Sequence, residues 1–159
     1  MHTLDPYHNN WIRELEGKKL LILHPFKNSI EYQINNNNTL LPVVKSIDII
    51  EAVQTIAGHV DTRFKDWFEA LDFMIEKIQM HEFDVCLIGC GAYGLPLAAA
   101  VKKMGKQAIH IGGPLQLLFK IKGKRWVDRD DYEFDKSCIY PLTEDTPSQA
   151  SKVEDACYW

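Results

Sequence analysis

Residues 83–104 constrain the fold of this chain more strongly than any other segment. Residues 83–88 form an apolar run that predicts a strand covered on both faces. Gly89, Gly91 and Gly94 follow directly with the spacing G-x-G-x-x-G, and residues 95–104 then have a helical pattern that ends at Gly105. The glycine spacing is informative because a strand precedes it and a helix follows it. The segment therefore predicts a strand–turn–helix unit of a parallel sheet.

Each glycine of this loop has a physical reason. The first permits a tight turn, the second lets an anion approach backbone N–H groups, and the third lets the helix pack closely on the strand. The helix N-terminus adds about half a positive charge and unsatisfied donors. We therefore expect Gly89, Gly91, Tyr93 and Gly94 to bind a small anionic ligand. The alternative is a tight turn that binds nothing.

The remainder of the chain alternates strands with helices. Further strands are predicted at 18–24, 47–53 and 107–111, and further helices near 30–34, at 66–79 with Asp66 as N-cap, and from 114 to 119. This alternation predicts an α/β, Rossmann-like, three-layer fold with a mostly parallel sheet of about four to five strands. We expect a domain at 1–126, followed by an irregular acidic tail at 127–159 that packs on the domain or on a partner.

Ligands of such sheets bind at the carboxyl ends of the strands, which here selects the loops at 24–29, 54–63, 89–94 and 112–116. In the last of these, Gly112, Gly113 and Gln116 indicate a second turn that tolerates an anion or faces a ribose. A dinucleotide site normally has an acidic residue about 20 residues after the glycine loop. Residues 109–112 read Ile-His-Ile-Gly instead, which disfavours an NAD(P)-dependent oxidoreductase but leaves it as an alternative.

Charge is distributed unevenly along the chain, although the formal net charge is only -4. Residues 102–125 contain seven basic residues and no acid, whereas residues 127–159 contain nine acids and three bases. The basic segment favours an anionic ligand. We expect Lys122, Lys124 and Arg125 to clamp a diphosphate beside Trp126, which stacks on a base. The alternative is a solvated turn anchored by a buried tryptophan.

Two histidines are candidate catalytic bases. His24 ends the first strand with Asn28 and Gln33 downstream, and His110 ends the fourth; each could instead be structural. His59 lies in a loop where a functional and a solvated role are equally compatible with the sequence. Asp128-Arg129-Asp130 has the D-x-D spelling of a metal site, so a divalent metal is possible, although chance explains three residues more readily. The sequence identifies no definite metal ligand and no definite cofactor.

Several classes of protein are disfavoured. The cysteines form no C-x-x-C pair and are expected to be reduced apolar residues; they are Cys86, Cys90, Cys138 and Cys157. No apolar run approaches the ~20 residues of a membrane span, and the N-terminus has no secretion signal, which predicts a cytoplasmic protein. Nucleic acid is not an expected partner, because the chain is acidic and its basic stretch lacks interleaved aromatics.

The order of motifs resembles a known family. Trp11 with Gly17-Lys18-Lys19-Leu20-Leu21-Ile22, then residues 83–94, then residues 105–113 are similar to the C-terminal half of GT-D-type glycosyltransferases. The chain also looks like uncharacterised proteins encoded among polysaccharide-synthesis genes. The resemblance covers roughly residues 11–126.

This resemblance implies sugar transfer from a nucleotide-sugar donor in glycan or polysaccharide biosynthesis, with the glycine loop near the diphosphate. The family's acidic catalytic motif lies in an N-terminal half that has no counterpart here. The resemblance therefore implies a fragment of a larger enzyme or a subunit whose partner supplies the N-terminal half, and a homo-oligomer is the other expected assembly. The alternatives are a non-catalytic nucleotide- or sugar-phosphate-binding module and the oxidoreductase named above.

Overall fold

The computed structural model describes residues 10–54, 61–127, 134–148, 150–152 and 154–159. The main elements in chain order are β1 Lys19–His24, α1 Lys27–Asn36, β2 Ser46–Glu51, α2 Trp67–Gln79, β3 Val85–Ile88, α3 Gly94–Lys103, β4 Gln107–His110, α4 Pro114–Leu118 and α5 Lys124–Val127. Short 3-10 turns include η1 Asn10–Leu15, η2 Gly91–Tyr93, η3 Thr143–Asp145, η4 Ala150–Lys152 and η5 Glu154–Ala156.

The four described strands form one parallel sheet in the order β2-β1-β3-β4. At its centre, Leu23 of β1 pairs with Ile50 of β2 on one side and with Ile88 of β3 on the other. The chain therefore runs from β1 to one neighbour and then returns to the opposite side of β1. This reversal between β1 and β3 is the position at which open α/β sheets bind ligands.

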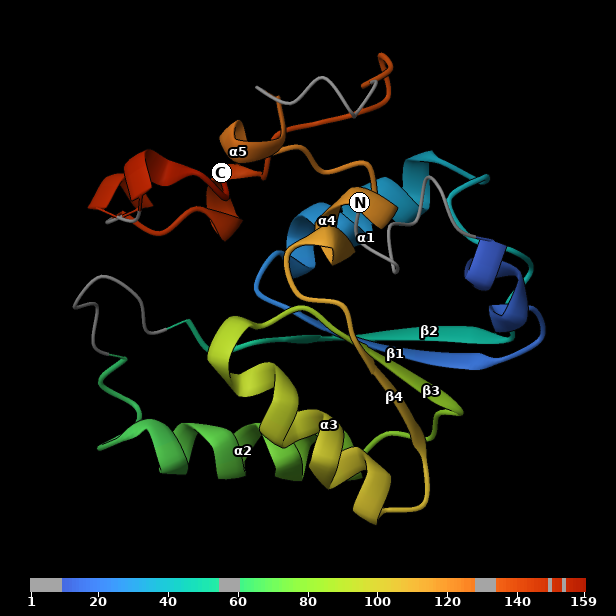
Figure 1. Cartoon of the computed structure of the whole chain (residues 1–159), viewed down its shortest axis with the longest axis vertical. Helices are drawn as coiled ribbons and strands as arrows, with labels where there is room; N and C mark the ends of the chain where they lie inside the picture. The colour runs from blue at the N-terminus through green and yellow to red at the C-terminus, as the bar shows by residue number, and fades with distance from the viewer. Residues whose placement is uncertain (1–9, 55–60, 128–133, 149, 153) are drawn as a thin grey trace.

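Helices cover both faces of the sheet (Figure 1). Helices α2 and α3 lie on one face, and α1 and α4 lie on the other. Alternate residues of β1 enter the two cores: Leu21 and Leu23 pack with α2 and α3, whereas Leu20 and Ile22 pack with α1 and α4. Because both faces of β1 are buried, the strand is almost continuously apolar. The predicted α/β, Rossmann-like, three-layer fold is confirmed.

Helix α2 begins where the sequence predicts. Asp66 is its N-cap, and its carboxylate accepts a hydrogen bond of 2.9 Å from the Glu69 N–H. Such a cap stabilises a helix by about 1 kcal/mol. Ala70, Met74 and Ile78 form the buried face of the helix, as their three- and four-residue spacing requires.

Helix α1 is twice as long as predicted, because its N-terminal cap comes from the tail. The residue before it, Phe26, provides no side-chain cap. Instead the buried carboxylate of Asp145 accepts hydrogen bonds from the N–H groups of Asn28, at 3.2 Å, and Ser29, at 2.6 Å. The side chains of Asn28 and Ser29 also donate to it. Asn28 is therefore part of a helix cap.

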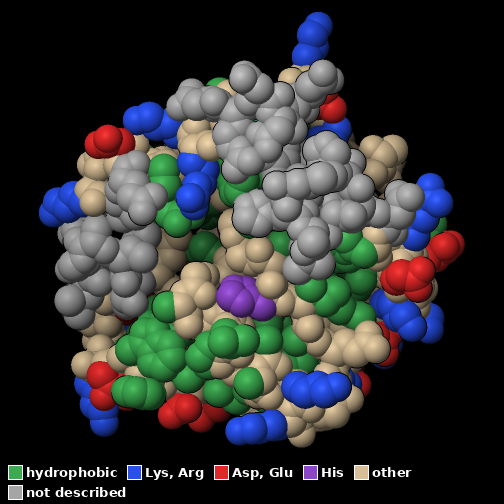
Figure 2. All heavy atoms as spheres, in the orientation of Figure 1, with side chains coloured by type: hydrophobic (Ala, Val, Ile, Leu, Met, Phe, Trp, Pro, Cys, Tyr) green, Lys and Arg blue, Asp and Glu red, His purple; other side chains and the backbone are tan. Residues whose placement is uncertain are grey.

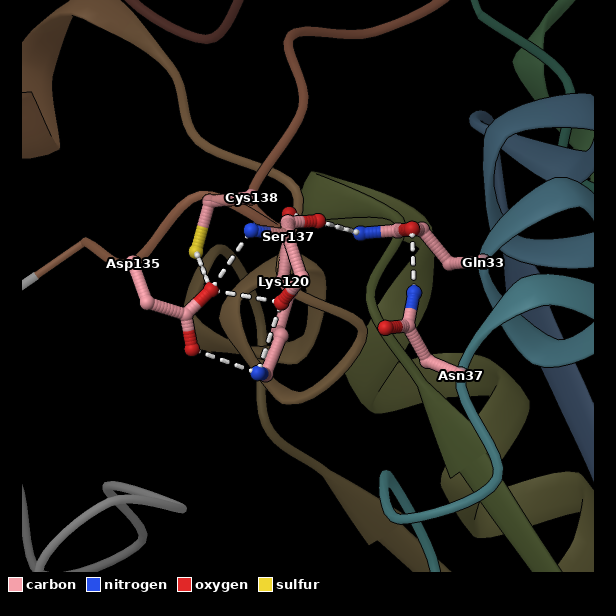
Figure 3. A network of polar contacts seen from close by, with 6 residues as sticks. All are labelled: Gln33, Asn37, Lys120, Asp135, Ser137 and Cys138. Atoms are coloured by element: carbon pink, nitrogen blue, oxygen red, sulfur yellow. Dashed lines mark hydrogen bonds and ion pairs between the residues drawn. The ribbon is translucent and has the colours of Figure 1, made fainter.

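A second part of the tail is fixed by a polar network that Figure 3 shows. The Gln33 amide donates to the carbonyls of Lys120 and Ser137, both at 3.0 Å, and accepts from the Asn37 amide. The Lys120 ammonium pairs with Asp135 at 2.7 Å. Gln33 is fully buried in this network, so it serves α1 and the tail and does not line the cavity described below.

The α2 and α3 side carries several exposed apolar side chains. Phe68, Met80 and Leu95 are 69, 73 and 71% exposed, and Figure 2 shows hydrophobic side chains gathered over this side of the molecule. Among the described residues, no helix combines the length and apolar character needed to cross a membrane.

Candidate functional site

A cavity of about 290 Å³ opens at the carboxyl ends of the strands. It receives residues from all four loops that the sequence selects, and from the tail. Its lining residues are His24, Pro25, Phe26, Val53, Gln54, Trp67, Gly89, Cys90, Gly91, Ala92, Tyr93, Gly113, Gln116, Arg125, Tyr158 and Trp159. The loops after β1 and β3, which flank the reversal of strand order, supply half of this set. Sheet topology therefore positions the cavity.

The three glycines of the loop have different structural roles. A Cβ on Gly89 would lie 2.6 Å from His24 Cδ2 and 3.0 Å from the Gly112 carbonyl, so the turn needs a glycine for space. Gly91 has φ +52°, a left-handed conformation that glycine adopts without strain. A Cβ on Gly94 would overlap the His110 imidazole, so this glycine lets α3 pack against the end of β4.

Two backbone N–H groups in the glycine turn between β3 and α3 are available to a ligand. The Tyr93 and Gly94 N–H groups donate to the Cys90 and Gly91 carbonyls within the turn. Among the described residues, the Gly91 and Ala92 N–H groups have no acceptor. Both residues are exposed and line the cavity, directly before the N-terminus of α3. Such donors, together with the helix dipole, favour an anion.

The structure separates the cations of the basic segment. Arg125 lines the cavity, is exposed, and has no carboxylate within ion-pair distance among the described residues. Its guanidinium lies over the ring of Tyr158, with 4.8 Å to the centroid. Lys122 instead lies over Tyr140, and Lys124 donates to the Asp155 carbonyl. Lys122 and Lys124 therefore do not join Arg125 at the cavity.

His24 is a buried, neutral wall of the cavity. It is 3% exposed, and burial lowers the pKa of its imidazole to about 3. Its Nδ1 accepts a hydrogen bond of 3.0 Å from the Phe26 N–H, so the proton resides on Nε2. A general base works best with a pKa near the operating pH. These properties suit a hydrogen-bond donor better than a base.

Gln116 is a buried amide at the same cavity. It is 1% exposed, and its Nε2 donates to the Ile121 carbonyl at 3.3 Å and to the Tyr158 carbonyl at 3.4 Å. Because both partners are carbonyl oxygens, the nitrogen must face them and the orientation of the amide is fixed. The side-chain oxygen Oε1 is left without a partner among the described residues.

Other predicted site residues lie outside the lining set. His110 packs on Gly94, and its Nε2 is buried without a partner among the described residues; burial lowers the pKa of its imidazole. Gly112 has φ +71° and forms the turn after β4. Trp126 is buried beside Gly113 instead of facing the cavity. His59 and Asp128-Arg129-Asp130 lie outside the described residues.

Apart from Tyr93, the aromatic walls of the cavity escaped the sequence analysis. Trp67 stacks on Tyr93 with ring centroids 5.0 Å apart and planes 6° from parallel. Phe26 and Trp159 contact each other on another side, with ring centroids 6.1 Å apart and planes tilted by 58°. Trp67 could have been found, since it begins the helix that follows the β2 loop. Tyr158 and Trp159 could not, because only tertiary contacts bring the tail to this edge.

The tail is held tightly where it forms the wall. The N–H groups of Lys124 and Arg125 donate to the carbonyls of Trp159, at 3.2 Å, and Cys157, at 2.9 Å. Gly123 lies so close to this segment that a Cβ would be 2.5 Å from the Tyr158 carbonyl oxygen. The described C-terminal end of the tail therefore forms part of the cavity wall.

Cysteine and metal chemistry find no support in the described residues. All four cysteines are free and buried, as expected, and burial raises the pKa of the Cys86 and Cys90 thiols to about 12. A thiol with so high a pKa is a poor nucleophile near neutral pH. Within the described part of the chain, no three His, Cys, Asp or Glu side chains are grouped as a metal site requires.

Fold and site together define an α/β protein of Rossmann-like architecture with a cavity at the reversal of strand order. Comparisons of the chain with protein-family models, with curated proteins and with solved structures found no significant match. The resemblance to GT-D-type glycosyltransferases therefore stays a prediction from sequence.

Proposed function

We propose that this chain binds a nucleotide, or the nucleotide part of a nucleotide sugar, in the cavity at the carboxyl edge of the sheet. The observation that carries this proposal is the composition of the cavity. Aromatic walls, an arginine with no carboxylate partner among the described residues, and two backbone N–H groups with no acceptor among them line one space of about 290 Å³. A nucleotide requires this combination, since it joins a flat apolar ring to an anionic group.

The same geometry favours a mononucleotide unit over a dinucleotide. Ligand cavities usually measure roughly 300–1,000 Å³, and this cavity lies at the lower limit. No acidic side chain belongs to the lining set, so a ribose clamp of the nicotinamide type is missing among the described residues. The proposal therefore places NAD(P) below nucleoside phosphates and nucleotide sugars.

The resemblance in sequence suggests sugar transfer as the reaction that this binding site would serve. In such a reaction Arg125 and the N–H groups of Gly91 and Ala92 would stabilise the charge that develops on the leaving nucleotide. His24 would orient the donor through its Nε2–H. Burial keeps His24 neutral and no Asp or Glu of the described residues lines the cavity, so we propose binding first and transfer as its extension.

The test is calorimetric titration of the full chain with nucleoside mono- and diphosphates, their sugar conjugates, and NAD(P). We expect saturable binding of at least one nucleoside phosphate and weaker binding of NAD(P). Turnover of the corresponding nucleotide sugar then separates a transferase from a binding module. Absence of binding by every nucleoside phosphate at millimolar concentration would contradict the proposal.

Arg125→Gln should weaken the binding of the best nucleoside phosphate by roughly ten- to a hundredfold. Loss of one charge-assisted contact to a phosphate has this effect. Lys124→Gln is the matched control, because it removes the neighbouring positive charge from a side chain that does not line the cavity. Calorimetry measures the nucleotide affinity of both variants. Equal losses of affinity in the two variants would indicate nonspecific electrostatic attraction and contradict a phosphate contact by Arg125.

A further inference from the structure

The cavity has two ends of different polarity. At the buried end, His24 and Gln116 are 3% and 1% exposed, and both are uncharged. Arg125 and the N–H groups of Gly91 and Ala92 belong to exposed residues, and the uncharged side chain of Gln54, which also lines the cavity, is half-buried. Burying a charged group without a counter-ion is costly, whereas a neutral polar edge can be buried if it is hydrogen-bonded. The ligand should therefore enter with its uncharged part first.

The buried end offers one donor and one acceptor, each with its orientation fixed by the protein. The Phe26 N–H occupies His24 Nδ1, so the ring presents Nε2–H as a donor. Two backbone carbonyls occupy Gln116 Nε2, so the amide presents Oε1 as an acceptor. Neither His24 Nε2 nor Gln116 Oε1 is among the described side-chain atoms that are both sealed from solvent and unpaired, so the cavity leaves each of them accessible.

We propose that Gln116 and His24 are specificity-determining residues that read the polar edge of a nucleobase, while its phosphate stays at the mouth with Arg125. Gln116 Oε1 accepts a hydrogen bond from an N–H of the base, and His24 Nε2–H donates to a ring nitrogen or carbonyl beside it. The aromatic walls hold the faces of the same ring. This assignment rests on the proposed nucleotide binding, and it adds the direction in which the ligand lies and the edge that is recognised.

Sugar hydroxyl groups could make the same pair of hydrogen bonds, since each is both donor and acceptor. The base is favoured because the wall residues are flat aromatic rings: Trp67 and Tyr93 are stacked, and Phe26 and Trp159 flank the side near His24. Chemical modification of the base therefore distinguishes recognition of the nucleobase from recognition of a sugar.

The experiment compares the best-binding nucleoside monophosphate with the analogue whose base lacks the edge N–H. The analogues are the monophosphates of 3-methyluridine, 1-methylguanosine, N6,N6-dimethyladenosine and N4,N4-dimethylcytidine. An acceptor that is buried and left unpaired is penalised strongly. We expect the analogue to bind the unmodified protein at least roughly tenfold more weakly by calorimetry.

Gln116→Met, which keeps the side-chain volume, provides the second arm. The substitution should weaken binding of the parent nucleotide. It should also reduce the affinity ratio between the parent nucleotide and the analogue to roughly threefold or less, because the acceptor is gone. If Gln116 has only a structural role, the substitution would weaken binding of both ligands equally and preserve the affinity ratio. If the variant does not fold, undiminished binding of the methylated analogue by the unmodified protein would still overturn the assignment.

Three outcomes are distinguishable. Discrimination in the unmodified protein that disappears in Gln116→Met supports the assignment. Nucleotide binding that depends on Arg125 but tolerates base methylation overturns the assignment and leaves the proposed function intact. Failure of every nucleotide to bind overturns both.

Discussion

Gly123→Ala should release the C-terminal segment from the domain and lower both stability and ligand affinity. The new Cβ would lie 2.5 Å from the Tyr158 oxygen and 2.8 Å from the Tyr158 carbonyl carbon, which are backbone atoms that cannot turn aside as a side chain can. The segment must move as a whole, with loss of its hydrogen bonds to Lys124 and Arg125. Overpacking of this kind costs roughly 1–3 kcal/mol of unfolding free energy.

Affinity should fall further than stability alone would suggest, because Tyr158 and Trp159 are cavity walls. We expect at least roughly a tenfold loss for the best nucleotide, comparable to the loss of an aromatic anchor from a binding site. Denaturant unfolding and calorimetry measure the two effects. Gly105→Ala is the control: its φ is +76° but a Cβ there meets nothing within 4 Å. It should cost about 1–2 kcal/mol without changing affinity. A Gly123→Ala protein with the stability and nucleotide affinity of the wild type would show that the tail does not complete the site.

Acidification should destabilise the protein through His24. Its imidazole has an ordinary pKa of 6.5 when exposed and a pKa lowered to about 3 by burial in the fold. Above pH 6.5 the imidazole is neutral in both states and contributes no pH dependence. Between pH 6.5 and pH 3 the unfolded chain binds a proton that the folded chain does not. The unfolding free energy therefore falls with decreasing pH by up to about 1.4 kcal/mol per pH unit.

His24→Gln isolates this contribution, because glutamine does not titrate and its amide oxygen can accept the Phe26 N–H. Unfolding free energies at pH 7 and pH 5 should show a smaller decrease for the variant than for the wild type. His81→Gln is the matched control, since His81 is a half-buried histidine outside the cavity, with 3.6 Å between its Nδ1 and Asp48 Oδ2. It should keep the wild-type decrease. An identical pH response in His24→Gln would contradict a buried neutral imidazole.

The parts of the fold that depend on local pattern were predictable. Strands β1 and β3 are apolar because both faces of the sheet are covered, and Asp66 caps α2 within its own segment. The length of α1 was not predictable, because its cap is Asp145, more than a hundred residues away in the chain. Capping rules consider only residues close in sequence to a helix end, so they do not find a carboxylate contributed by a distant segment.

The position of the cavity was predictable to the same degree. The rule that ligands bind at the carboxyl ends of parallel strands places His24, Gly89 and Gln116 at one edge, and the structure brings them to one cavity. The basic run could not be resolved from sequence. Lys120 pairs with Asp135 of the tail, and Lys122 lies on Tyr140, and neither lysine lines the cavity. Arg125 also lies on a tail ring, that of Tyr158, but its tertiary position puts it in the cavity lining.

The central claim is that free backbone N–H groups at the turn between β3 and α3 hold the anionic group of a ligand. Titration of the 15N-labelled protein with the best nucleoside phosphate, followed by amide NMR, tests this claim directly. We expect the largest shifts at Gly91 and Ala92, with Gly17 and Gly105 unchanged, since these two glycines lie outside the cavity lining. Largest shifts far from this turn, with Gly91 and Ala92 unmoved at saturation, would contradict the account.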